Sequence, residues 1–113
     1  MASALQQLVP GQFVPNTETT LYTSPTGTTT RIDKVTVTNT DAVAHTITIH
    51  LVPAGGTAGG SNCSTQAQSI LPGKTWNSPN EYGQTLRAGD FFSAIADSAG
   101  YLALFVAGTQ VTN

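Results

Sequence analysis

Two stretches of strict apolar–polar alternation decide the fold of this chain: Val35-Thr36-Val37-Thr38 and Thr46-Ile47-Thr48-Ile49-His50-Leu51, separated by Asn39-Thr40-Asp41-Ala42. Successive side chains of a β-strand point to opposite faces, so each stretch predicts a strand with one aliphatic face and one face made mainly of threonine. The short polar connection predicts that the two strands pair as an antiparallel hairpin. A sheet with one apolar face needs a second layer to cover that face.

Further short strands, bounded by turn residues, are expected on both sides of this region. They are predicted at residues 19–23, 64–71, 75–78, 91–96 and 101–107, the last two joined as a second hairpin by Ser98-Ala99-Gly100. About seven or eight strands with almost no helix predict an all-β fold, a single-domain antiparallel β-sandwich of jelly-roll or immunoglobulin-like type. The strand at 101–107 is apolar on both faces, which is typical of a strand that is covered on both sides, by its own chain or by another subunit.

The first 19 residues have a different pattern from the rest of the chain. Their apolar side chains follow no period and are interrupted by Pro10 and Pro15, which predicts an extended arm at residues 1–19 before a sandwich domain at residues 20–113. An arm this apolar must dock, either on its own sheet or on a neighbouring subunit. The side chains expected at an interface, from the arm and the last strand, are Leu5, Leu8, Val9, Phe13, Val14, Tyr101 and Phe105.

Composition excludes several classes of partner. Charged residues make up 9% of the 113 residues, and the formal net charge is -2. The four basic residues are scattered, so binding to nucleic acid or to an anionic membrane is not expected. A surface with so little charge favours burial against copies of the chain or against other proteins. The N-terminus lacks the pattern of a signal peptide and no stretch approaches the roughly 20 apolar residues of a membrane helix, so synthesis in a cytoplasm is expected.

Catalytic residues, cofactors and metal ions are not expected. Gly73-Lys74-Thr75 resembles the end of a phosphate-binding loop, but Gln68 stands where that motif requires its first glycine. His45 and His50 are predicted on opposite faces of one strand and are expected at the surface or an interface; a metal shared between subunits or a pH-sensitive contact are the alternatives. Cys63 is expected to be an ordinary half-buried thiol, with a Cys–His nucleophile pair as the alternative.

Two aromatic residues, Trp76 and Tyr82, flank a stretch that contains Asn77, Pro79 and Asn80. Aromatic faces stack on the C–H surfaces of sugars, so these two residues are a candidate carbohydrate-binding platform. The more ordinary interpretation is that they anchor the core or a subunit contact.

Several short motifs resemble those of a family of small virion proteins of tailed bacteriophages. They are Leu21-Tyr22-Thr23-Ser24-Pro25-Thr26-Gly27, the strand end Val37-Thr38-Asn39-Thr40, the loop Val52-Pro53-Ala54-Gly55-Gly56 and the turn Leu86-Arg87-Ala88-Gly89-Asp90. The resemblance covers residues 20–107 and leaves the arm outside it. It implies a structural β-sandwich, often repeated in many copies on a capsid or tail, and no catalytic residues.

The resemblance and the composition together lead to one functional expectation. The chain is expected to be a non-enzymatic virion protein, made in the bacterial host cytoplasm. Specifically, we expect a head decoration or cement protein that forms a homo-oligomer, a trimer, and bridges subunits of the major capsid protein. The alternative is a carbohydrate- or receptor-binding module of a tail fibre or baseplate.

Overall fold

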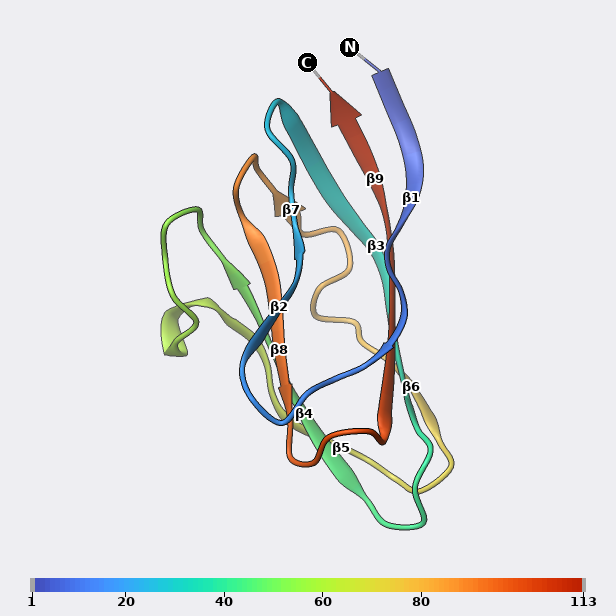
Figure 1. Ribbon diagram of the computed structural model, residues 1–113. Helices are drawn as coiled ribbons and strands as arrows, with labels where there is room; N and C mark the ends of the chain where they lie inside the picture. Colours follow the sequence, from blue (N-terminus) through green and yellow to red (C-terminus); the bar gives the residue numbers. More distant parts are fainter. Residues whose placement is uncertain (1, 113) are drawn as a thin grey trace.

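Two antiparallel sheets face each other in the computed structural model, which describes residues 2–112 (Figure 1). The strands are β1 (Ala2–Phe13), β2 (Thr19–Thr23), β3 (Thr28–Asn39), β4 (His45–Val52), β5 (Cys63–Ile70), β6 (Thr75–Asn77), β7 (Thr85–Leu86), β8 (Phe91–Ala96) and β9 (Leu102–Thr112). Sheet A has the order β1-β9-β3-β6, with β7 also paired to β3, and sheet B has the order β2-β8-β4-β5. The all-β sandwich expected from the sequence is therefore confirmed. Met1 and Asn113, the outermost residues of the expected arm and sandwich, lie outside the described range.

The two predicted hairpins are wrong. β3 belongs to sheet A and β4 to sheet B, and likewise β8 belongs to sheet B and β9 to sheet A. The chain therefore crosses from one layer to the other at both connections. Alternation determines which face of a strand is apolar, but two such strands can meet edge to edge in one sheet or face to face across a core. Here they meet across the core.

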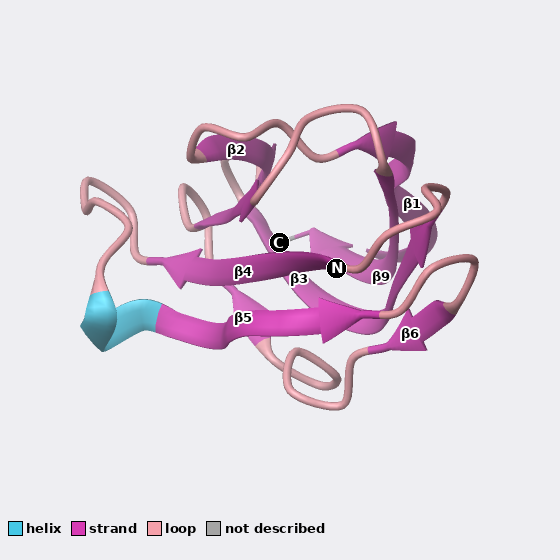
Figure 2. Ribbon diagram, turned by 90° about the horizontal axis from the view of Figure 1, so that it is seen from below, coloured by secondary structure: helices cyan, strands magenta, loops and turns pink. Residues whose placement is uncertain are grey.

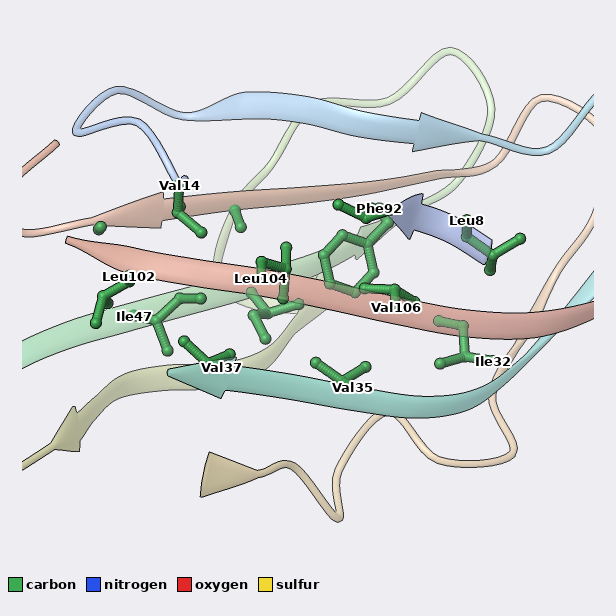
Figure 3. Close-up of a cluster of buried hydrophobic side chains, with 14 of the residues drawn as sticks. Leu8, Val14, Ile32, Val35, Val37, Ile47, Phe92, Leu102, Leu104 and Val106 are labelled. Carbon is green, nitrogen blue, oxygen red and sulfur yellow. The ribbon is translucent and has the colours of Figure 1, made fainter. Parts of the chain in front are cut away.

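The core consists of the inward-facing side chains of both sheets (Figure 3). Phe92 of β8 lies in the middle of this cluster and is almost fully buried. The other members of the cluster are Leu8, Val9, Val14, Ile32, Val35, Val37, Ile47, Ile49, Ile70, Leu86, Ala94, Ala96, Leu102, Leu104 and Val106. Burial of apolar surface, at about 25 cal/mol per Å², is the main stabilising contribution to such a sandwich.

The N-terminal segment is part of this sandwich. β1 pairs with β9 from Ala2 opposite Thr112 to Phe13 opposite Ala103, so it forms an edge strand of sheet A. The two alternatives were docking on its own sheet and docking on a neighbouring subunit, and the structure shows the segment on its own sheet. The backbone hydrogen bonds continue past residue 13, and no break separates residues 2–19 from the rest of the described chain.

Three of the residues expected at an interface are core residues of the same chain. Leu8, Val9 and Val14 are buried between the sheets. The expectation that they face a neighbouring subunit is therefore corrected. The reason is the irregular pairing of β1: its register with β9 shifts between Gln7 and Val9, and this shift lets Leu8 and Val9 both point inward.

The loop after β4 contains the single helical turn of the described chain. This turn, η1 (Gly60–Asn62), immediately precedes β5, and Figure 2 shows β5 beside β4 at the edge of sheet B. Asn62 closes the turn, because its side-chain oxygen accepts a hydrogen bond from the Gly59 N–H at 3.0 Å.

Gly108 marks a place where β9, β3 and β1 leave no room for a side chain. A Cβ at this position would lie 2.4 Å from the carbonyl oxygen of Arg31 and 2.7 Å from Cδ1 of Leu8. Backbone cannot move aside as a flexible side-chain tip can, so glycine is required here for steric reasons.

We expect Gly108→Ala to lower the free energy of unfolding by about 1–3 kcal/mol, because overpacking forces the β3 backbone apart. Urea unfolding followed by fluorescence measures the change. Gly60→Ala is the matched control, since a Cβ at Gly60 meets nothing within 4 Å. Equal unfolding midpoints for the two variants would contradict the packing described here.

Candidate functional site

The outer face of β9 carries an exposed aromatic side chain of sheet A. Leu102, Leu104 and Val106 point into the core, whereas Tyr101 and Phe105 alternate to the outside. Phe105 is 46% exposed. The expectation that β9 is covered on both faces is therefore not met within the chain itself.

Pairing between β1 and β9 places a second aromatic residue beside Phe105. Pro10 is directly opposite Phe105 and Phe13 is opposite Ala103, so all four share the outer face. Phe13 is 51% exposed. A groove of about 270 Å³ runs between the two aromatic side chains and is called the aromatic groove below. It is lined by Pro10, Gly11, Gln12, Phe13, Ala103 and Phe105.

Gly11 leaves room for the Phe105 ring beside the edge strand. The register of β1 shifts between Pro10 and Gln12, so Gly11 is an extra residue with a φ of 100°. A Cβ there would lie 2.6 Å from Cε2 of Phe105. Glycine thus serves two purposes, since it accepts the left-handed backbone and leaves space for the ring.

A smaller hollow of about 70 Å³ flanks Phe105 on its other side. It is lined by Gln7, Val9, Lys34, Thr36, Phe105, Val106 and Ala107. Lys34 is the one charged residue that lines either hollow. Chemically, this surface can accept apolar side chains of a partner, because it offers aromatic faces and one charged side chain.

His45 joins the two connections that cross the core. Its Nδ1 donates to Asp97 at 2.9 Å and its Nε2 donates to Asp41 at 2.7 Å. The ring also stacks on Tyr101, with centroids 4.9 Å apart and planes 5° from parallel. Asp41 follows β3, while Asp97 and Tyr101 lie between β8 and β9, so one imidazole holds both crossings.

Both ring nitrogens of His45 face carboxylates, which only accept hydrogen bonds, so the imidazolium form fits this site. The hydrogen bond to Asp41 raises the pKa of His45, burial opposes that rise, and Asp97 adds to it. The hydrogen bond with His45 lowers the pKa of Asp41 in turn. The expectation of a surface or interface histidine is corrected, since His45 is buried.

We expect the stabilising contribution of His45 to depend on pH. Because its pKa is raised in the folded chain, the contribution is full below the ordinary value near 6.5 and is lost as the pH rises through the higher folded pKa. The pKa of Asp41 is lowered in the folded chain, so its effect on stability runs in the opposite direction with pH. The stabilising contribution of Asp41 is lost only as the pH falls below about 4.

Urea midpoints measured from pH 5 to pH 9 for the natural chain and for His45→Gln test this. The difference between the two chains should shrink toward the alkaline end. A difference that is constant over the range would contradict an imidazolium at this position.

Glu81 is a fully buried carboxylate held by hydroxyl groups. Ser64 donates to its Oε2 at 2.6 Å and Thr65 donates to the same oxygen at 2.7 Å, while Ser78 donates to Oε1. These bonds attach the loop between β6 and β7 to β5. No local signal in the sequence identifies Glu81, because two of its partners lie 16 and 17 residues away.

We expect Glu81→Ala to lower the free energy of unfolding by about 2–4 kcal/mol, since it leaves buried hydroxyls without an acceptor and opens a cavity. Glu81→Gln keeps the shape and one acceptor oxygen, so its loss should be clearly smaller. Thermal or urea unfolding of both variants provides the measurement. An alanine variant as stable as the natural chain would show that the hydroxyls find other partners.

His50 and Cys63 are neighbours on the outer face of sheet B. They are directly opposite each other across β4 and β5. Nδ1 of His50 lies 3.2 Å from Glu18, to which Ser93 also donates, and the Cys63 thiol donates to the Thr65 carbonyl at 3.4 Å. The Cys63 hydrogen bond therefore leads away from His50, whose Nδ1 has no hydrogen-bond partner among the described residues. His50 is also buried, which corrects the expectation of a surface position.

Trp76 and Tyr82, the candidate carbohydrate platform, lie in different environments. Trp76 is opposite the fully buried Val37 in the β3–β6 pair and packs against the core. Tyr82 is 73% exposed in the loop after β6. Of the two rings, only that of Tyr82 is broadly exposed. Trp76 is therefore a core anchor, which was the more ordinary interpretation of this residue.

Within residues 2–112, no group of three or more histidine, cysteine, aspartate or glutamate side chains is arranged to hold a metal ion. The same residues include no helix long and apolar enough to cross a membrane.

Comparisons with known proteins bear on the fold. No family model matches the chain, and no curated protein matches it. A solved structure from the work "Bacillus endospore appendages form a novel family of disulfide-linked pili" is similar, with a TM-score of 0.56 and 13% sequence identity. The match covers 97% of this chain and 88% of the other. At this identity the likeness shows a shared sandwich fold.

Proposed function

We propose that the chain is a non-enzymatic structural protein of a tailed-bacteriophage virion, a head decoration or cement protein that docks through the outer face of sheet A. The observation that carries this proposal is the aromatic groove, with the half-exposed Phe13 and Phe105 at its sides. The phage motifs of residues 20–107 supply the biological setting, and the virion is the proposed location.

Physical chemistry favours this face over the rest of the surface. Aromatic side chains in a shallow, uncharged hollow are the usual anchors of protein interfaces, because they bury much area with few rotatable bonds. The low charge of the chain, 9% of its residues, means that little desolvation of ions opposes docking. Many weak contacts over a capsid lattice would then reinforce one another.

The likeness to an endospore pilus protein supports a structural role in one respect. A pilus is built from many copies of a subunit, so a distantly similar sandwich serves there as a building block. We propose the same kind of use here, with the major capsid protein or another virion protein as the partner.

We expect the double variant Phe13→Ser, Phe105→Ser to bind virion particles at least about tenfold more weakly than the natural chain, since two apolar anchors are lost. The measurement is co-sedimentation of purified protein with heads of the source phage from which this protein has been removed. Tyr82→Ser is the matched control, because it removes an exposed aromatic residue elsewhere. Equal binding of both variants would contradict docking through sheet A.

The alternative, a carbohydrate- or receptor-binding module, stays a prediction. Because Trp76 packs against the core, Tyr82 is the ring of the pair that a sugar would reach. Glycan-array binding that is lost in Tyr82→Ser would favour this alternative over the decoration role.

A further inference from the structure

The N-terminal half of β1 is an open edge of sheet A. β1 is the first strand of that sheet, and it has a hydrogen-bonded neighbour, β9, on one side. Residues 2–7 are all exposed, so they are covered on neither face. Figure 1 shows this half of β1 beside the end of β9, where both termini lie at one end of the molecule. The backbone groups along the outer side of such a strand are free to pair with another strand.

The other sheet edges in the described chain are protected against pairing. β5 has Ala67 at a φ of 48° and two register shifts against β4. β2 has five residues with a shift after Thr20, and β6 has three residues. The second half of β1 is interrupted by Pro10 and two shifts. Bulges, prolines and short strands are the devices by which proteins block unwanted edge pairing.

Residues 2–7 lack every one of these devices. They pair with residues 107–112 in unbroken register, and the segment Ala2-Ser3-Ala4-Leu5-Gln6-Gln7 contains neither a charge nor a proline. Leu5, in its middle, is 83% exposed. An uncharged, regular and exposed edge is suited to accept a strand of equally neutral character.

We propose that this edge pairs antiparallel with the same edge of a second copy, across a two-fold axis at Leu5, so that the two A sheets become one continuous sheet. In this register Ser3 is opposite Gln7 of the second copy, Ala4 is opposite Gln6, and Leu5 is opposite Leu5. The most exposed apolar side chain of the strand then covers its own equivalent. Such an isologous contact closes after two copies and gives a dimer, in place of the trimer expected from the sequence.

A second copy satisfies the chemistry of this edge without a further partner. The segment is neutral, so it has no charge that would select a partner of opposite sign, and the polar residues Ser3 and Gln7 are set opposite each other by the same axis. The inference concerns self-association and does not depend on the aromatic groove, so it stands or fails separately from the proposed function.

The test is light scattering of the full chain over a dilution series. The natural chain should be a dimer at high concentration and dissociate on dilution. Leu5→Lys should raise the dimer dissociation constant at least about tenfold, because it places two like charges opposite each other. Leu71→Lys is the matched control, since Leu71 is also exposed, at 60%, but lies outside this edge.

The two-fold register has a stricter consequence. Leu5→Lys and Leu5→Glu should each be monomeric at concentrations where an equimolar mixture of the two forms a heterodimer, because lysine is then opposite glutamate. Unchanged unfolding midpoints would show that both variants are folded. A natural chain that is monomeric at all concentrations overturns the proposal. A dimer that Leu5→Lys leaves intact also overturns it. So does a finding that this edge pairs with a strand of another protein and not with a second copy.

Discussion

The sandwich depends on the apolar layer between β3 and β9 on one side and β4 and β8 on the other. Hydrophobic attraction is strong but non-directional, so it brings the sheets together without selecting how the strands are connected. Buried polar groups supply that selection. Asn39 donates to the carbonyls of Val43 and Ile70 at 2.8 Å each, and His45 joins Asp41 to Asp97. These bonds stabilise the crossings from one sheet to the other, because each group would be costly to bury alone.

The same sheet that closes the core offers two separate surfaces to the outside. The aromatic groove lies on the outer face near Phe13, whereas the open edge lies along residues 2–7. A two-fold axis at Leu5 would stand perpendicular to the continuous sheet, so both grooves of a dimer would face the same side. Two weak docking contacts on one side would then act together, which raises the effective affinity for a repeating lattice.

Local pattern predicted the strands well and their pairing poorly. The expected strands at 19–23 and 91–96 coincide with β2 and β8, and the expected apolar faces of β3 and β4 are the buried ones. The connections from β3 to β4 and from β8 to β9 are short, but a short connection suits a hairpin and a crossing equally. The roles of Glu81 and His45 were likewise out of reach, because Thr65 and Asp97, among their partners, are distant in sequence and come close only after the sheets have packed.

By itself, the sequence determined where most strands form, β1 and β7 excepted, and which of their faces are apolar, since both follow from the side-chain alternation of a single strand. It also determined the neutral character of the chain and the absence of an internal disulfide, because Cys63 is its single cysteine. Only the tertiary structure decided which strands share a sheet, that Leu8 and Val9 belong to the core, and that Phe105 stays half exposed. These properties depend on register, bulges and contacts between distant segments, which no local pattern of residues encodes.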